Sequence, residues 1–378
     1  MRSLLEKTMR LALPAVVILL ACGEGPADAK DRSGEPASEP AVVPAAEMAT
    51  ARATHTATLL PSGEVLITGG CRQGCETWSA ATEIYDPETN TFREGPEMSD
   101  VRAAHAATLL KGGRVLVSGG WSYEEPGSET ATVASAEIYD PEANAFVETG
   151  SMEAARSAHR MVTLSDGRVL AIGHRTVEAY DPEKGTFETA GELTTERSSH
   201  ATVLLPDDRV LVTGGESEGG GVQASAEIFD PATGTSTPTG SMAVPRYKHG
   251  AATLADGRVL VVGGSGRGPS AWTDQHTSAE VWDPATGRFE SVADMAETRF
   301  KIRDAVVALP DGSAAIAGGG ERVEIYDPES ESFRSAAGEV GSPRMFATAT
   351  LLDSGDVLLV GGYDEGIDST ARAWLLRR

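Results

Sequence analysis

The sequence has few cationic residues, few aromatic residues and few cysteines. Its 378 residues contain 32 Lys and Arg against 56 Asp and Glu, a formal net charge of −24 at pH 7, and only 5% are aromatic. Non-specific nucleic-acid binding requires a cationic surface that displaces counterions, so no nucleic-acid partner is expected. The sequence also lacks a nucleophile–base motif, a zinc signature and a phosphate-binding loop. It therefore predicts no catalytic residue, no metal and no cofactor.

Long apolar segments are absent after residue 21. Residues 11–21 (LALPAVVILLA) are apolar but short for a bilayer-spanning helix, and they follow a positively charged segment, residues 2–10. The run ends in Leu-Leu-Ala-Cys at Cys22, which resembles the cleavage box of bacterial lipoproteins. The resemblance implies that residues 1–21 are a signal peptide, that Cys22 is lipidated and, because Gly follows it, that the protein is exported to the outer membrane. An ordinary signal peptide with an incidental Cys is the alternative.

The segment after the lipidation site is predicted to be a flexible tether. Residues 23–40 are rich in Pro, Gly, Ser and charge and show no apolar periodicity. Residues 22–40 are therefore expected to hold a folded domain, residues 41–376, at the bacterial envelope. Membrane contact is expected through the lipid anchor only.

Two of the three cysteines lie close together. Cys71 and Cys75 belong to one loop segment, CRQGC. In an exported protein they could form a small disulfide, because they are outside the reducing cytosol. A metal site is the alternative, but it would need further ligands that C-x3-C alone does not supply. We therefore predict a Cys71–Cys75 disulfide.

Glycine and internal repetition are abundant. Residues 102–146 contain R-x-x-H, an apolar run, a Gly-containing turn, a second apolar run ending in Gly-Gly, then A-E-I-Y-D-P and a Phe. This pattern recurs in seven copies. The arginines that open the copies are Arg52, Arg102, Arg156, Arg197, Arg246, Arg299 and Arg344. The distance from the Arg to the Gly pair is 17 residues in six copies and 19 in the sixth, whereas the next interval, to the Asp of Y-D-P, varies from 8 to 21. Constant intervals indicate strands in a shared packing scheme, and variable ones indicate a solvent-facing loop.

Each copy is predicted to form four strands. The second apolar run, such as VLIT or VLVS, shows no alternation, which is typical of a strand buried on both faces. One such sheet cannot cover both its faces, but seven arranged radially cover each other. The Gly-Gly pair, the Y-D-P turn and the downstream aromatic residue resemble Kelch repeats over residues 41–376. The resemblance implies an all-β, seven-bladed Kelch-type β-propeller.

The ring is predicted to be closed by the N-terminal strand. The seventh copy stops after its third strand. Val42 stands six residues before Met48, just as Phe92 stands six residues before Met98. Residues 41–47 are therefore expected to complete the last blade, which would remove two exposed sheet edges.

The variable loops and the arginines are predicted to share one face of the propeller. Aromatic residues in these loops are candidate contacts for a sugar or a partner pocket, although each could instead stabilise its own loop. They are Trp78, Trp121, Tyr123, Trp272 and Tyr363. The seven arginines could form a cationic ring for an anionic group. Alternatively, they are structural and pair with equally repeated glutamates: Glu83, Glu137, Glu178, Glu227, Glu280 and Glu324.

The sixth copy departs from the pattern. Five histidines follow the arginines by three residues, and we interpret them as packed, hydrogen-bonded side chains rather than a metal ring: His55, His105, His159, His200 and His249. In the sixth copy, alignment back from Gly318 puts Lys301 at the Arg position and Asp304 at the His position. This break, with Phe300 and Arg303 beside it, is where a specialised site is first expected.

The predicted function is an envelope-anchored binding module that recognises a protein or a glycan through its variable loop face. Fold alone does not establish this. An enzyme is the alternative: some Kelch propellers are sialic-acid mutarotases, which need only a few polar side chains at the channel mouth. Others are copper-radical oxidases, which need a Cys cross-linked to a Tyr and are less favoured here. A purely structural envelope protein is a third possibility.

Overall fold

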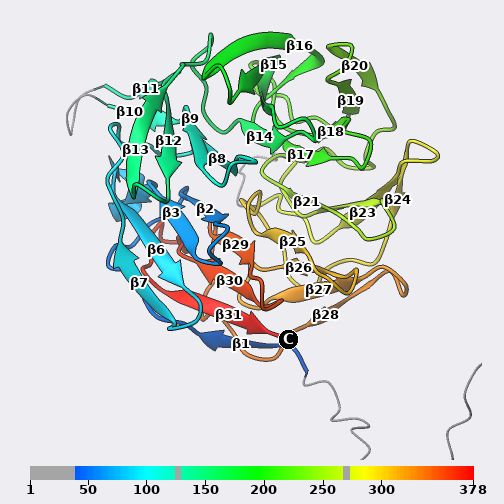
Figure 1. Ribbon diagram of the computed structural model, residues 1–378. Helices are drawn as coiled ribbons and strands as arrows, with labels where there is room; N and C mark the ends of the chain where they lie inside the picture. The colour runs from blue at the N-terminus through cyan, green and yellow to red at the C-terminus, as the bar shows by residue number, and fades with distance from the viewer. Residues whose placement is uncertain (1–38, 124–128, 267–272) are drawn as a thin grey trace, which may run out of the picture. The chain divides into compact units, whose positions relative to one another are not determined.

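The computed structural model describes residues 39–123, 129–266 and 273–378. The predicted signal peptide, Cys22 and most of the predicted tether therefore lie outside the described residues. Residues Glu39–Arg378 form one unit, in which Figure 1 shows sheets arranged around a common centre. No helix among the described residues has the length and apolar character needed to cross a membrane.

Seven antiparallel sheets form the blades. Blade 1 contains β2 (Thr56–Leu59), β3 (Val65–Thr68), β6 (Thr82–Asp86) and β7 (Thr91–Glu94). Blade 2 contains β8 (Ala106–Leu109), β9 (Val115–Ser118), β12 (Ala136–Asp140) and β13 (Ala145–Thr149). Blade 3 contains β14 (Arg160–Thr163), β15 (Val169–Asp181) and β16 (Thr186–Arg197). Blade 4 contains β17 (Ala201–Leu204), β18 (Val210–Thr213), β19 (Ala226–Asp230) and β20 (Thr235–Pro238).

The remaining blades follow the same order. Blade 5 contains β21 (Gly250–Thr253), β22 (Val259–Val262), β23 (Ala279–Asp283) and β24 (Arg288–Ser291). Blade 6 contains β25 (Val306–Ala308), β26 (Ala314–Ile316), β27 (Glu324–Asp327) and β28 (Ser332–Ser335). Blade 7 contains β29 (Thr348–Leu351), β30 (Val357–Val360), β31 (Ala373–Arg377) and β1 (Ala41–Pro44). Two short ribbons, β4 (Cys71–Arg72) with β5 (Thr77–Trp78) and β10 (Trp121–Ser122) with β11 (Ala131–Thr132), lie in the loops of blades 1 and 2, and η1 (Gln73–Cys75) joins β4 to β5.

The first strand of each blade lies innermost, as Figure 1 shows for β2, β8, β14, β17, β21, β25 and β29. The second strands are buried on both faces, as predicted: Val65, Leu66 and Ile67 of β3 are all 0% exposed. The all-β, seven-bladed propeller predicted from the sequence is thus confirmed.

The predicted closure of the ring is also confirmed. Strand β1 pairs antiparallel with β31, with Val42 opposite Leu376 and Pro44 opposite Trp374. The strand covers Ala41–Pro44, shorter than the predicted residues 41–47. Val42 is buried in the cluster that also contains Trp374, so the N-terminal strand completes both the hydrogen bonding and the core of blade 7.

Blade 3 differs from the predicted four strands. Its second and third strands run together as β15, which pairs with β16 through two register shifts, between His174 and Thr176 and between Val177 and Glu178. The reason is the short interval in this copy, only 8 residues from Gly173 to Asp181, which leaves no room for a loop.

The core lies between neighbouring blades. Tyr139 of blade 2, for example, packs with Leu66 and Ile84 of blade 1 and lies 5.3 Å, centroid to centroid, from Phe146. The equivalent aromatic residues are all at most 4% exposed: Tyr85, Tyr139, Tyr180, Phe229, Trp282, Tyr326 and Trp374. Full burial of one such side chain is worth about 1.5–3 kcal/mol, so each blade depends on its neighbours for stability.

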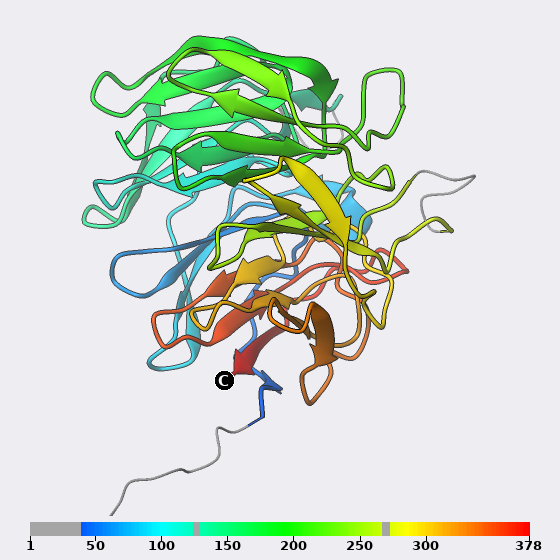
Figure 2. The same cartoon turned by 90° about the vertical axis from the view of Figure 1, so that its right-hand side faces the viewer.

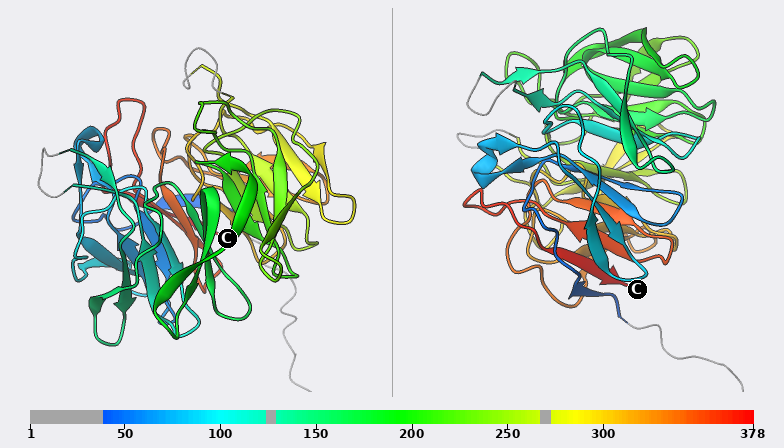
Figure 3. Two further views of the ribbon diagram at one scale, coloured as in Figure 1. Left: turned by 90° about the horizontal axis from the view of Figure 1, so that it is seen from above. Right: turned by 60° about the vertical axis from the view of Figure 1, so that its left-hand side comes forward.

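The long connections between second and third strands lie on one face of the ring, which we call the loop face (Figures 2 and 3). The chain entering each inner strand runs along this face, because Ala53 N–H donates to the Cys71 carbonyl (3.0 Å) and Ala103 N–H to the Trp121 carbonyl (3.1 Å). The arginines and the variable loops therefore meet at one end of the central channel, as expected.

Candidate functional site

Six of the seven repeated arginines are buried and form hydrogen bonds and ion pairs within their own blades. Arg52 is typical: it is 0% exposed, its Nη1 donates to the Gly69 carbonyl (2.8 Å), and its Nη2 contacts Glu83 (2.8 Å). The other oxygen of Glu83 accepts the backbone N–H of Ala49 (2.7 Å). The same arrangement holds, with at most 1% exposure of the arginine, at Arg102, Arg156, Arg197, Arg246 and Arg299. These six form no cationic ring toward solvent, so the structure favours their structural pairing with the glutamates.

Arg344 is the exception. In blade 7 the Glu position is Arg372, and the Arg344 guanidinium instead lies 5.5 Å from the centroid of the Trp374 ring. Arg344 is 7% exposed, and its Nε has no hydrogen-bond partner within the described chain. Burial lowers its pKa, although Asp364 opposes that effect. Blade 7 thus carries an arginine without the carboxylate that the other blades supply.

The alignment of the sixth copy needs correction. Arg299, not Lys301, occupies the arginine position, because its Nη1 donates to the Gly318 carbonyl (2.8 Å) and its Nη2 contacts Glu324 (2.8 Å). Ile302, not Asp304, lies at the histidine position: a Cβ on Gly263 would meet Ile302 Cδ1, as a Cβ on Gly69 would meet the ring of His105. The two extra residues of this copy therefore come after Ile302, not before it.

A belt of seven residues with the same backbone conformation surrounds the channel at the loop face. The residue two positions after each repeated Arg has a positive φ between 52° and 58°: Thr54, Ala104, Ala158, Ser199, Lys248, Lys301 and Phe346. Backbone hydrogen bonds join most neighbouring belt residues, as when Ala104 N–H donates to the Thr54 carbonyl (3.0 Å) and Phe346 N–H to the Lys301 carbonyl (2.8 Å). Within the described residues, no such bond joins Ser199 to Ala158. At blade 6, the N–H that donates to the Lys248 carbonyl (3.2 Å) is that of Ile302 and not that of the belt residue Lys301. Non-glycine residues rarely adopt this backbone conformation, so the belt holds seven side chains at fixed places around the channel mouth.

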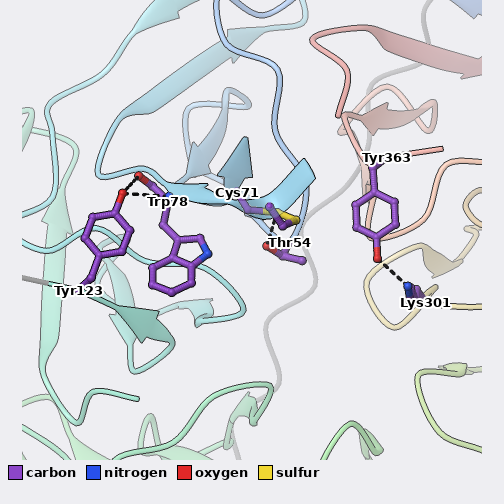
Figure 4. The surroundings of a disulfide bond; sticks show 7 residues. Thr54, Cys71, Trp78, Tyr123, Lys301 and Tyr363 are labelled. Atoms are coloured by element: carbon purple, nitrogen blue, oxygen red, sulfur yellow. Dashed lines mark hydrogen bonds between the residues drawn. A yellow bond between two sulfur atoms is a disulfide. The ribbon is translucent and has the colours of Figure 1, made fainter. Parts of the chain in front are cut away.

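The belt brings two lysines together among aromatic rings on blades 5 to 7. Lys248 Nζ lies 5.2 Å from the Tyr247 ring centroid and 5.7 Å from that of Phe346. Lys301 Nζ lies 5.6 Å from the same Phe346 centroid and 5.0 Å from that of Tyr363. Lys301 Nζ also donates to Tyr363 Oη at 2.6 Å, as Figure 4 shows. We call these residues, together with Phe300, the lysine–aromatic cluster.

The electrostatics of this cluster favour an anion. Burial, and secondly the nearby charge of Lys248, lower the pKa of Lys301 to about 8. Burial raises the pKa of Tyr363, which keeps its phenol neutral. An anion between the two ammonium groups would relieve their repulsion, because opposite charges nearby stabilise the charged form of lysine. Sequence reasoning identified Tyr363 and the region of Lys301 but missed Lys248, since nothing in a single copy marks the belt position.

The loop aromatics differ in exposure. Trp78 and Tyr123 stack with ring centroids 4.8 Å apart, and Tyr123 Oη both accepts from the Trp78 N–H (3.1 Å) and donates to the Trp78 carbonyl (3.1 Å), as Figure 4 shows. This pair joins the loops of blades 1 and 2, which supports a role in loop packing. Tyr363 is 5% exposed, whereas Trp121 is 40% exposed and available for contact. Trp272 lies outside the described residues.

Cys71 and Cys75 form a disulfide within the loop of blade 1. Cys71 is 1% exposed, and its Sγ accepts a hydrogen bond from Thr54 Oγ1 at 3.4 Å. Since Thr54 belongs to the belt, the disulfide loop is connected to the channel mouth (Figure 4). Cys71 also packs in one cluster with Tyr363, which links this loop to the lysine–aromatic cluster.

Four of the five repeated histidines connect neighbouring blades through a hydrogen bond at Nε2. The prediction of hydrogen-bonded side chains does not hold for His200, whose two ring nitrogens have no partner in the described chain. His105 Nε2 is hydrogen-bonded to Thr68 of blade 1 (2.9 Å) and His159 Nε2 to Ser118 of blade 2 (3.0 Å). Burial, followed by the charge of Arg52, lowers the pKa of His55 to about 3, so this ring stays neutral. Within the described residues, no three His, Cys, Asp or Glu side chains gather as metal ligands would.

Comparison with known proteins agrees with this architecture. A sequence model of the Kelch motif matches residues 52–99 and 246–296, which cover the repeats of blades 1 and 5. The chain is a Kelch-repeat β-propeller. No curated protein has significant sequence similarity to it.

The Kelch propeller is similar to solved structures across most of its length. One is a fungal alcohol oxidase of the AA5 family in complex with copper, which is 18% identical, with a TM-score of 0.67 over 88% of this chain and 75% of that one. Another is YjhT, 12% identical, with a TM-score of 0.60 over 87% of this chain and 95% of that one. At these identities the likenesses show the fold and carry no assignment of activity.

Proposed function

We propose that the protein is an envelope-anchored binding module whose loop face recognises a glycan that carries acidic groups. The observation that supports this most is the lysine–aromatic cluster. Two ammonium groups offer a place for a carboxylate or sulfate, and the adjacent rings offer apolar faces on which sugars stack. Trp121, which is 40% exposed, extends the contact surface on the same face.

Binding to a glycan array, followed by titration of the best ligand, tests this proposal. Wild-type protein is expected to bind acidic glycans. Replacing either Lys248 or Lys301 by Ala should weaken binding about ten- to hundredfold, because a hydrogen bond to a charged group is worth about 1.5–3 kcal/mol, and the double variant should lose more. Lys184→Ala is the matched control, since Lys184 is 62% exposed beside the Asp-Pro turn of blade 3, on the opposite face. Preference for neutral glycans, or equal binding by the double variant, would contradict the proposal.

Attachment to the membrane through Cys22 is part of the same proposal. The apolar leader that ends at Cys22 supports it. Cells that express the protein are expected to incorporate labelled fatty acid into it and to retain it in the outer-membrane fraction. Cys22→Ser should abolish the label. A label that persists in this variant would disprove the anchor.

A second candidate is proton transfer on a sugar, as in a mutarotase. It is favoured by the direct contact between Lys301 and Tyr363, because an amine whose pKa is about 8 can both give and take a proton near neutral pH. Exchange between anomers of sugar acids, followed by NMR, would show a rate increase that Lys301→Met removes. A copper-radical oxidase fits less well, since Cys71 forms a disulfide with Cys75 and the Tyr363 phenol accepts a hydrogen bond from Lys301.

A further inference from the structure

The two extra residues of the sixth copy lie inside the central channel. Arg303 and Asp304 precede Ala305 and β25, and both line a cavity of about 240 Å³ between the inner strands of the blades. Asp304 forms an ion pair with Arg160, which begins β14 of blade 3. Arg160 Nη2 also donates to the Arg303 carbonyl at 3.0 Å. Blades 3 and 6 are therefore connected directly across the channel (Figure 1).

The charges in this cavity do not balance. Arg303 Nε donates to Asp304 Oδ2 at 2.9 Å, and the Arg303 side chain is 3% exposed. Although burial favours the neutral acid, Arg160 and Arg303 lower the pKa of Asp304 to about 2, so it is ionised at neutral pH. Two guanidinium groups thus share one carboxylate.

The neighbouring histidines add no charge. Burial, together with the charges of nearby arginines, holds the pKa of each ring far below its usual value: His55, His105, His159, His200 and His249. Arg303 lines the same cavity as His105 and His159. The cavity therefore carries one net positive charge.

The guanidinium group of Arg303 has hydrogen-bond donors that Asp304 does not use. The Arg303 side chain makes one hydrogen bond in the described ranges, through Nε, so Nη1 and Nη2 remain as donors on a residue that lines the cavity. Nε of this buried guanidinium is paired with Asp304, but its remaining donors are unfavourable unless an anion or water satisfies them. Its two parallel N–H groups match the two oxygens of a carboxylate.

We propose that the central channel binds a small carboxylate through Nη1 and Nη2 of Arg303, with Arg160 contributing a second positive charge. The cavity is smaller than the ~300–1,000 Å³ typical of drug-sized ligands, so the ligand is a few heavy atoms in size. Alanines line it, among them Ala107 and Ala251, which suits a short apolar tail on the carboxylate. This site is separate from the loop-face cluster and does not depend on the proposed glycan binding.

Thermal unfolding and isothermal titration with acetate and propionate test the site. In the unfolding series, acetate or propionate replaces chloride at constant ionic strength. Wild-type protein should melt at higher temperature as the carboxylate concentration rises, because a ligand that binds the folded state stabilises it. Arg303→Gln should weaken binding about ten- to hundredfold. Arg93→Gln is the control, since Arg93 is 49% exposed on the outer strand of blade 1.

Asp304→Asn provides a second test with the opposite sign. Removing the one carboxylate leaves two unneutralised guanidinium groups, so the added carboxylate should bind several-fold more tightly than to wild type. The proposal is overturned if acetate and propionate stabilise wild-type protein no more than chloride does. It is equally overturned if folded Arg303→Gln binds as wild type does, or if inorganic phosphate binds and carboxylates do not.

Discussion

Lys301 and Tyr363 come from different blades, yet the lysine Nζ donates to the tyrosine Oη at 2.6 Å. The contact depends on the belt, which fixes the backbone of Lys301 at φ 58°, and on the bridge that pairs Met345 with Tyr363 in blade 7. A cation is thereby held in an aromatic setting where burial and Lys248 lower its pKa to about 8.

The lowered pKa of Lys301 predicts how ligand binding depends on pH. Below pH 8 Lys301 is an ammonium group, and above it the amine becomes neutral. Affinity for an acidic glycan should therefore be greatest between pH 6 and about 7.5 and should fall as the pH rises to 9, well before an ordinary lysine would lose its charge. Titrations at these pH values check it. Lys301→Arg should keep its affinity at pH 9, and a pH-independent wild type would argue against a ligand at this lysine.

The same shift predicts how stability depends on pH. The unfolded chain binds a proton at Lys301 up to its ordinary pKa near 10.5, whereas the folded chain releases it near 8. Between these values the unfolded state binds more protons, so this group makes the folded state more stable as the pH rises. Lys301→Met should melt higher than wild type at pH 7, and the difference should shrink by pH 10. A constant difference at the two pH values, measured by calorimetry alongside Lys184→Met, would contradict this account.

Much of the fold followed from intervals in the sequence. The 17 residues from Arg to Gly-Gly in six copies correspond to one hydrogen bond, from Arg52 Nη1 to the Gly69 carbonyl in blade 1, and the sixth copy keeps this bond although its interval is 19 residues. Counting back 17 residues from Gly318 gives the wrong alignment of the sixth copy, because it assumes that the two extra residues lie before the segment that ends at Gly318. The structure places them after Ile302, where the chain enters the channel. The position of the two extra residues, before the arginine or after Ile302, is decided by side-chain packing, which the sequence alone does not show.

The site was harder to predict than the fold. The belt positions carry Thr, Ala, Ser, Lys and Phe, not the Gly or Asn that usually signal a positive φ. The sequence therefore gave no reason to group Lys248 with Lys301. Burial of the arginines could not be decided from the sequence either, since a repeated Arg and a repeated Glu are compatible with both a solvent-facing ring and an internal pair.

The internal arginine–glutamate pairs predict a graded loss of stability. Arg246→Met leaves Glu280 buried and unpaired, which should cost about 3–5 kcal/mol of unfolding free energy. Arg344→Met should cost clearly less, because no glutamate pairs with Arg344 in blade 7. Urea unfolding of both variants checks the order. Equal losses would show that the pairing with glutamate contributes little beyond the packing of the arginine side chain.

The closure of the ring by β1 predicts that a short N-terminal truncation destabilises the whole propeller. Removing residues 41–44 exposes the edge of β31 and uncovers part of the cluster that contains Trp374 and Leu376. The loss of the buried Val42 side chain alone should cost about 1.5–3 kcal/mol, and the lost strand pairing adds to it. Two matched proteins, one beginning at residue 39 and one at residue 45, should therefore differ in melting temperature by several degrees, as expected for a loss of about 1.5–3 kcal/mol or more. Val42→Asp in the longer protein should reproduce most of the difference, because a charge would replace the apolar contact while the backbone pairing with Leu376 could still form. If the two proteins melt together, the ring is held by its other blade contacts and the N-terminal strand is dispensable.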